Sequence, residues 1–321
     1  MPDTVLCVGS VTADIIVPAV DALPSPGTLK SVGSISEHVG GCASNAAIDL
    51  AKLGIPSSLV CRIGRDTFGD FVLDTVRRSG ADVSGVLRDE AIGTTVSVVL
   101  VDSGGERRFL YYPGSTSAFT ARDVPETLLD GCACVFIAGA MLLTRFDGVP
   151  CAALLRRAKE KGKMTVMDTA WDFEDIWMDK IRPSLPWLDY FLPSYDEAAR
   201  LTGESDPPLM ARSLHALGAR HVAIKLGGEG AYLLPENGAG VYLPACDAGE
   251  VVDTTGAGDS FCAGFLCGLM QGWEPERCGR FANAVGAHCV TKVGASSGIR
   301  PMADILAFME KQDKAVAGGI P

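Results

Sequence analysis

The sequence predicts an α/β domain built on a mainly parallel sheet, with a small β-sheet lid standing off it. Short β-branched runs alternate with longer helical stretches, which is typical of parallel strands joined by crossover helices. Two stretches, Leu29–Val39 and Thr94–Tyr112, break this alternation because they have strand character and no intervening helix. The chain has 321 residues, 47% of them hydrophobic, so it is long enough to bury the core of one large domain.

The strands expected in the central sheet begin with the apolar run Val5–Val8. The later strands are predicted at Leu59–Ile63, Val135–Ala138, Met164–Met167, Tyr190–Leu192 and Val222–Leu226. Helices are predicted at Ala46–Leu53, Thr67–Arg78, Pro150–Glu160, Asp196–Leu201, Leu209–Leu217, Asp259–Gln271, Pro275–Val290 and Met302–Lys311. Gly54 and Gly80 follow the first two helices, where glycine commonly ends a helix.

The second interruption predicts a β-hairpin. Its strands are Thr94–Val101 and Glu106–Tyr112, and its turn is Asp102-Ser103-Gly104-Gly105. We expect a lid from about residues 12–40 and 92–114, within a single domain over residues 1–321. The alternative is that these strands extend one edge of the main sheet. An exposed lid edge would also allow a homodimer formed through the lid.

Charge and cysteine content restrict the class of partner and the compartment. The chain has 39 acidic and 28 basic residues, a net charge of −11, which argues against nucleic-acid or anionic-membrane surfaces. Its eleven cysteines form no Cys-x-x-Cys pair, which indicates a reduced environment. No basic leader precedes Val5–Val8, and no apolar run approaches the ~20 residues that span a bilayer. These features predict a cytoplasmic protein.

The strongest motif runs from Asp253 to Phe261, in the order Asp-Thr-Thr-Gly-Ala-Gly-Asp-Ser-Phe. Gly256, Ala257 and Gly258 precede an apolar helix, so consecutive backbone N–H groups can converge there on an anion. Asp259 then stands at the helix start, where a carboxylate suits accepting the proton of an attacking hydroxyl. The alternative is an ordinary helix N-cap.

A second glycine cluster begins at Gly40 and Gly41 and continues Cys-Ala-Ser to Asn45. Paired glycines permit close approach to a polar ligand, and Asn45 offers both a donor and an acceptor. Asp14 lies just past the first strand, so these residues suit binding of vicinal hydroxyls; the alternative is a tight turn with a cap. The third cluster, from Lys225 to Gly230, is weaker evidence, and the chain has no Walker sequence.

The two long motifs, Gly40–Gly64 and Asp253–Phe265, resemble both signatures of the ribokinase-like, or PfkB, carbohydrate kinases. They occur in the family's order and spacing, and the strand–helix pattern fits across essentially the whole chain. The resemblance implies a ribokinase-like three-layer α/β/α fold with a β lid. It also implies transfer of the γ-phosphate of ATP to a hydroxyl of a small sugar.

The resemblance further implies roles for individual residues. Asp259 would be the catalytic base, and Gly256, Ala257 and Gly258 would form the anion hole for the γ-phosphoryl group. The acceptor would be bound by Asp14, Gly40, Gly41 and Asn45. The nucleotide would be lined by Ser194, Lys225, Gly227, Gly228, Gly230 and Asn283.

Two metal sites follow from the same resemblance. Glu197 would hold Mg²⁺ through water, although Ser194 replaces the asparagine common in the family and Glu197 could simply be a solvated acid at a helix start. A monovalent cation, expected to be K⁺, would lie beside the anion hole. Its ligands would be Asp253 and Thr255, with mainly backbone oxygens of Cys289, Lys292, Gly294 and Ser297 or Gly298.

Rival functions share part of this pattern. A nucleoside kinase of the same fold would need an aromatic pocket, for which Phe109, Tyr111 and Tyr112 are candidates. A non-catalytic sugar- or nucleotide-binding protein would not need the base at Asp259. Strand alternation also indicates that either Arg107 or Arg108 of the hairpin points toward the site.

Overall fold

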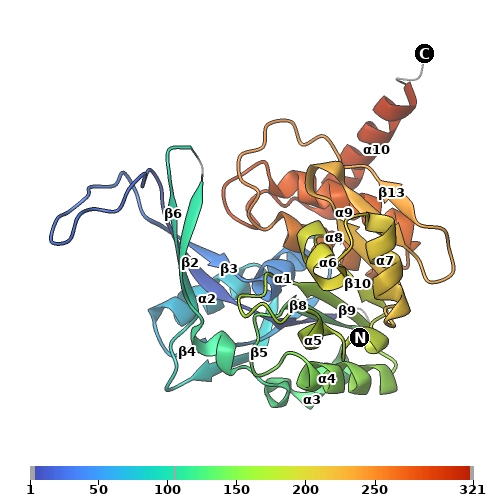
Figure 1. Ribbon diagram of the computed structural model, residues 1–321, viewed down its shortest axis with the longest axis horizontal. Helices are drawn as coiled ribbons and strands as arrows, with labels where there is room; N and C mark the ends of the chain where they lie inside the picture. The colour runs from blue at the N-terminus through green and yellow to red at the C-terminus, as the bar shows by residue number, and fades with distance from the viewer. Residues whose placement is uncertain (1–3, 105, 319–321) are drawn as a thin grey trace.

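The computed structural model describes residues 4–104 and 106–318, and a large, mostly parallel sheet runs through it (Figure 1). Within that part of the chain the sheet has nine strands, in the order β13-β12-β11-β10-β9-β8-β1-β4-β5. All neighbours pair in parallel except at β11–β12 and β12–β13, which are antiparallel. In sheet order the strands are Val241–Leu243, Ala231–Leu234, His221–Lys225, Tyr190–Phe191, Met164–Thr169, Cys134–Ala140, Val5–Gly9, Ser57–Gly64 and Asp82–Asp89.

Helices cover both faces of this sheet, because its central strands are apolar on both sides. In β1, Val5 and Cys7 belong to one hydrophobic core, whereas Leu6 and Val8 belong to the other. The first core packs against α1, α2, α8, α9 and α10, and the second against α3, α4, α6 and α7. The helices α1 to α10 are Cys42–Lys52, Thr67–Arg78, Glu126–Gly131, Val149–Glu160, Met178–Ile181, Tyr195–Thr202, Pro207–Ala216, Ala257–Met270, Pro275–Cys289 and Met302–Gly318. The predicted three-layer arrangement is confirmed.

Local sequence signals set several of the helix ends. Asp66 caps α2 by accepting a hydrogen bond from the N–H of Gly69 at 2.8 Å. Gly54 and Gly80 have φ of +83° and +95°, the left-handed conformation expected just past a helix. The short 3₁₀ turns are Gly114–Ala118, Ala121–Asp123, Leu185–Trp187 and Gly227–Glu229.

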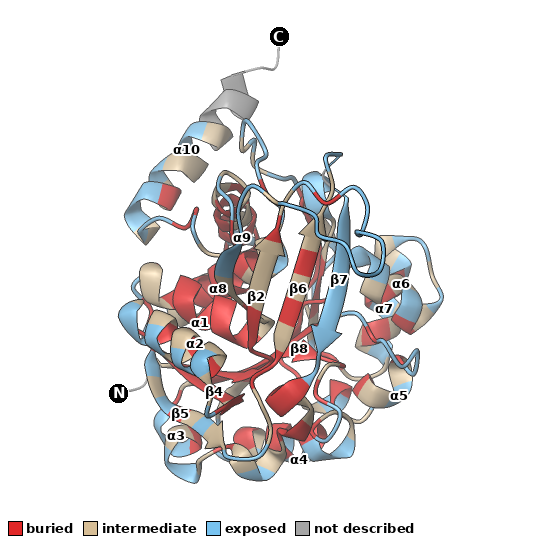
Figure 2. Ribbon diagram, turned by 90° about the vertical axis from the view of Figure 1, so that its left-hand side faces the viewer, coloured by how far each residue is buried: buried red, intermediate tan, exposed pale blue. Residues whose placement is uncertain are grey.

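The lid is a separate four-stranded sheet rather than an extension of the main one (Figures 1 and 2). Its order is β3-β2-β6-β7, in which β2 and β6 are parallel and the other pairs are antiparallel. The hairpin β6–β7 forms as predicted, although Gly105 of its turn lies outside the described residues. The strands β2, β3, β6 and β7 are Thr12–Val17, Ser36–Gly40, Val96–Val101 and Arg107–Tyr112.

The strand expected over Leu29–Val39 is wrong for its first seven residues. Only Ser36–Gly40 is a strand, and residues 29–35 form an irregular, exposed segment. Leu29 and Ile35 are 101% and 64% exposed, so no apolar surface faces them. Without a neighbouring strand to pair with, β-type residues alone do not make a strand. The helix predicted from Ala46 also begins earlier, at Cys42, so Asn45 lies in its first turn.

The regular elements that the sequence analysis did not predict include β5, β12, β13, α3 and α5. The strand β5 is mostly exposed or half-buried and contains Gly85, so it lacks the apolar run that marked the others. Among the described residues, no helix combines the length and apolarity that crossing a bilayer requires.

Candidate active site

A cavity of about 770 Å³ lies at the carboxyl ends of β9 and β11 and the start of α8. In sheets of this kind ligands bind at the carboxyl ends of the strands. The lining of this cavity brings together three groups of residues that were predicted from the sequence. They are the glycine nest with Asp259, the Ser194 and Glu197 pair, and the nucleotide set Lys225, Gly227, Gly228, Gly230 and Asn283.

The nest before α8 has the backbone that the motif predicts. Gly256 is the N-cap of α8 and has φ of +79°, and a side chain there would come within 2.5 Å of Ala295. Glycine is therefore required at this position by both conformation and space. The N–H of Ala257 donates to the carbonyl of Thr254 at 3.2 Å, whereas the N–H groups of Gly258 and Asp259 have no partner within α8 and can face an anion.

Asp259 lies in the first turn of α8 and is held by a residue of α1. The side-chain amide of Asn45 donates a hydrogen bond to Oδ2 of Asp259 at 2.8 Å. Burial raises the pKa of Asp259, while the hydrogen bond from Asn45 and the charge of Lys225 oppose that rise. A raised pKa makes this carboxylate a better proton acceptor than an exposed aspartate, which suits a general base.

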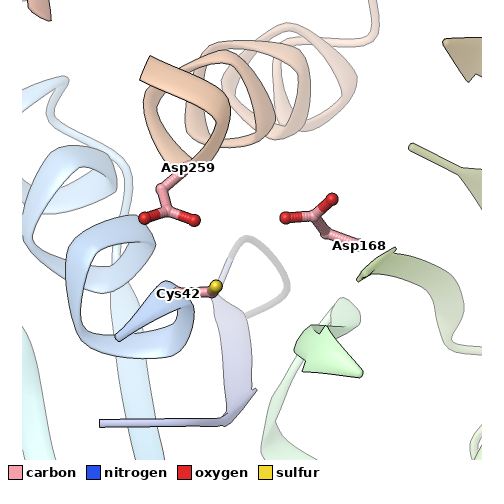
Figure 3. Close-up of side chains that lie close together, drawn as sticks. All are labelled: Cys42, Asp168 and Asp259. Carbon is pink, nitrogen blue, oxygen red and sulfur yellow. The ribbon is translucent and has the colours of Figure 1, made fainter. Parts of the chain in front are cut away.

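Two residues beside Asp259 were not assigned a role from the sequence. Figure 3 shows Cys42 and Asp168 facing the same space as Asp259, from three different elements. One ligand atom from each lies within 4.8 Å of the others. Asp168 could have been predicted, because it is a polar residue near the end of the parallel strand β9. Cys42 gave no such signal.

Asp168 is paired with Lys225 in a buried ion pair. The Nζ of Lys225 donates to Oδ1 of Asp168 at 2.5 Å, and both side chains are nearly inaccessible. Burial opposes the charge on Lys225, but Asp168 and Glu197 together raise its pKa well above the usual value. A Cβ placed on Gly258 would lie 3.5 Å from this Nζ, so a fixed positive charge stands beside the nest.

Asp14 lies on the lid side of Asp259. Burial and the negative charge of Asp259 raise the pKa of Asp14 to about 6. A side chain at Gly40 would come within 2.1 Å of Oδ2 of Asp14, and one at Gly41 within 2.6 Å of the backbone of Ser10. The two glycines therefore let β3 and α1 approach Asp14 and the end of β1 closely.

The residues predicted to line the nucleotide also hold the local backbone. Ser194 and Glu197 form a capping box at the start of α6, and Oε2 of Glu197 also accepts a hydrogen bond from Thr169 at 2.8 Å. The amide of Asn283 donates to the carbonyls of Leu243 and Pro244, so it fixes the segment that follows β13. The residues whose side chains make these bonds all border the cavity, namely Thr169, Ser194, Glu197 and Asn283.

The residues predicted to bind a monovalent cation gather around Asp253 rather than in the large cavity. The N–H of Gly294 donates to one oxygen of Asp253, and the N–H of Thr255 donates to the other, both at 2.9 Å. The Cys289 thiol contacts the carbonyl of Thr255 at 3.4 Å. Gly294 and Ser297 border a second cavity of about 420 Å³, and Lys292 is exposed.

The lid touches the main body at two places beside this site. Arg107 of β7 forms an ion pair with Asp253 at 2.5 Å and also contacts the hydroxyl of Thr255. The Tyr111 ring stacks on Phe173, with centroids 5.7 Å apart. The lid is therefore tied to the main body both at the loop before α8 and at Phe173.

The sequence of residues 2–301 matches the model of the pfkB family carbohydrate kinases. This chain belongs to the pfkB family. It is 30% identical over 304 residues to the 2-dehydro-3-deoxygluconokinase of Bacillus subtilis strain 168, covering 89% of this chain and 91% of that protein. It is also 30% identical over 303 residues to a ribokinase of Arabidopsis thaliana, covering 90% of this chain and 76% of the other.

The fold agrees with this assignment. A solved structure of Arabidopsis thaliana ribokinase, complexed with ribose and ATP, matches with a TM-score of 0.85 at 25% identity, covering 97% of this chain and 99% of that one. The pfkB member described here is accordingly a carbohydrate kinase, a phosphotransferase. The predicted family and the predicted enzyme class are both confirmed.

Proposed function

We propose that this pfkB kinase transfers the γ-phosphoryl group of ATP to a hydroxyl of a small, uncharged sugar. The observation that carries the proposal is the position of Asp259. It lies one residue past the glycine nest, borders the large cavity and is hydrogen-bonded to Asn45. A proton acceptor beside an anion-binding nest is what phosphoryl transfer to a hydroxyl requires.

The acceptor end of the site favours hydroxyl groups. The Oδ1 of Asn45 is buried and has no hydrogen-bond partner among the described residues, which is costly unless a ligand supplies a donor. Asp14 is a second acceptor close to Asp259, and the positive charge of Arg107 is taken up by Asp253. These groups suit the O–H donors of a neutral polyol better than a carboxylate or phosphate.

In the reaction, Asp259 would orient the acceptor hydroxyl and take its proton as the O–P bond forms. The N–H groups of the nest and the Lys225 ammonium would offset the negative charge that develops on the transferred group. The lid contacts at Arg107 and Tyr111 would keep water away, so that ATP is not hydrolysed instead. The leaving group is ADP.

The carboxylates in the cavity fit a magnesium ion. Glu197, Asp168 and Asp259 all border the cavity. Mg²⁺ prefers oxygen ligands and keeps several waters. Glu197 would hold the ion through water, as the sequence predicts. When bound, Mg²⁺ would neutralise phosphate charge during transfer.

An ADP-release screen over neutral sugars, sugar acids and nucleosides, with ATP and Mg²⁺ present, tests the proposal. We expect a neutral sugar to give the highest kcat/KM, and Asp259→Asn to abolish the release that depends on it. Turnover with nucleosides alone would instead identify a nucleoside kinase. Thermal stabilisation by a sugar, without any ADP release, would indicate a binding protein that has lost catalysis.

A further inference from the structure

The contact between Arg107 and Asp253 joins the lid to the loop that leads into the nest. Arg107 is the first residue of β7, and Asp253 lies three residues before Gly256. The guanidinium is paired with Oδ1 of Asp253 at 2.5 Å and also donates to the hydroxyl of Thr255. Figure 1 shows the hairpin β6–β7 standing beside the loop that precedes α8.

The hydrogen bonds of the Asp253 carboxylate are already made. Oδ1 accepts from the N–H of Thr255 as well as from Arg107, and Oδ2 accepts from the N–H of Gly294. The residue is only 7% exposed. Two backbone N–H groups and the guanidinium of Arg107 therefore enclose this carboxylate. A buried anion of this kind needs one positive charge nearby.

Thr255, the second side chain expected beside a monovalent cation, is also engaged, because its hydroxyl accepts a hydrogen bond from Arg107. The thiol of Cys289 lies 3.4 Å from the carbonyl of Thr255 and 3.0 Å from that of Ala295. The backbone of Gly294 presents its N–H, not its carbonyl, to Asp253. A hard cation needs several oxygens free to face it, and Arg107 occupies both Oδ1 of Asp253 and the hydroxyl of Thr255, so the site does not fit a cation while Arg107 is in place.

We propose that the guanidinium of Arg107 takes the place of the monovalent cation at Asp253, so that the lid itself supplies the charge that the nest loop requires. The proposed kinase therefore works without a specific monovalent cation. Because Arg107 belongs to the lid, the loop before the nest is neutralised only while the lid is closed. Arg107 is thus a positioning residue that couples lid closure to the anion hole.

Arg108 provides a matched comparison within the same strand. Its guanidinium lies 3.8 Å from Asp102 in its own hairpin, and its side chain is 60% exposed. In the β6–β7 pairing Arg107 lies opposite Val101 and Arg108 opposite Leu100, so the two point to opposite faces of the lid. Substitution of Arg108 therefore removes the same charge from the strand without touching Asp253.

Thermal unfolding in potassium, sodium or choline chloride at equal ionic strength tests cation binding without any need for a known acceptor. We expect the wild-type protein and Arg108→Ala to unfold at the same temperature in all three salts. Arg107→Ala opens the Asp253 site, so potassium should stabilise it over choline by about 2 °C or more. Arg107→Lys keeps the charge and should stay indifferent to the cation.

The same four proteins are then assayed for ADP formation with the best acceptor from the substrate screen. In choline chloride Arg107→Ala should lose about tenfold in kcat, and potassium should restore part of it. Selective stabilisation or activation of the wild-type protein by potassium would overturn the proposal. An Arg107→Ala variant that folds but does not respond to potassium would also overturn it. So would an Arg108→Ala variant that potassium stabilises or activates as expected for Arg107→Ala. If Arg107→Ala does not fold, Arg107→Gln is tested by the same criteria.

Discussion

Asn45 and Asp259 are joined by a 2.8 Å hydrogen bond across 214 positions of the sequence. This bond ties α1 to α8, and a second one runs from the hydroxyl of Ser260 to the buried carboxylate of Asp49 at 2.6 Å. The residue expected to bind the acceptor therefore also orients the expected base. Asn45 can do both, because its Nδ2 donates to Asp259 and its Oδ1 has no partner in the part of the chain that the structure describes.

Replacing Asp259 by Asn should separate activity from stability. Loss of the proton acceptor should lower kcat by about 10²–10⁴-fold. The pKa of Asp259 is raised by burial, so its ionised form costs stability at every pH above the value of the unfolded chain. A neutral amide removes that cost, and the melting temperature at pH 7 should stay the same or rise. A marked fall in melting temperature would contradict this view of the site.

Replacing Asn45 by Ala should change the pH dependence of the reaction. The hydrogen bond from Asn45 favours the ionised form of Asp259, so its loss should raise the pKa of Asp259 further. The acidic limb of the profile of kcat/KM against pH should then move to higher pH. The exposed Asn237→Ala variant serves as control, and an unmoved limb would show that the hydrogen bond does not act on the base.

Acceptor binding should weaken in mild acid because of Asp14. Its pKa is raised to about 6, so between about pH 7 and about pH 5 the ionised fraction falls about tenfold. The KM for the acceptor should rise by a similar factor over that range, while the KM for ATP should change little. In Asp14→Asn the acceptor KM should be high and independent of pH. A pH-dependent acceptor KM in that variant would assign the effect to another group.

The stability of the fold should depend on Lys225 and Asp168 balancing each other's charge. Activity should depend on the positive charge of Lys225. Lys225→Met leaves the buried Asp168 uncompensated, which costs about 3–5 kcal/mol of unfolding free energy. Urea unfolding should show most of that loss recovered in Lys225→Met/Asp168→Asn. Turnover should stay low in both, because neither has a positive charge beside the nest. Removing the charge of Arg77 from the exposed Arg77–Asp74 pair is the control, and it should leave the urea unfolding midpoint unchanged.

A homodimer through the lid remains a prediction, and β7 is where it would form. This strand is the edge of the lid sheet, and Phe109 and Leu110 on it are 60% and 65% exposed. Sedimentation should show a dimer that dissociates in Phe109→Lys. Tyr242→Lys, on the exposed edge strand of the main sheet, should leave it intact. A monomer at all concentrations would refute the dimer.

Local patterns in the sequence predicted most of the fold. The apolar runs identified β1, β4, β8 and β9, because strands buried on both faces carry little else. They failed at β5, which is only partly buried, and at residues 29–35, which have strand-type residues but no neighbouring strand. Whether a strand forms depends on what lies beside it, which no short window records.

The sequence by itself determined that Asp259 follows a glycine nest at a helix start, because the nest and the helix are continuous in the chain. Only the tertiary structure decided that Asn45 reaches Asp259, that Lys225 faces Asp168, and that Arg107 contacts Asp253 rather than leaving that place to Arg108. These contacts join residues 214, 57 and 146 positions apart. They depend on the packing of α1 on α8, on the order of the strands and on the pleat of β7. These features arise from contacts between distant parts of the chain, which the local sequence does not encode.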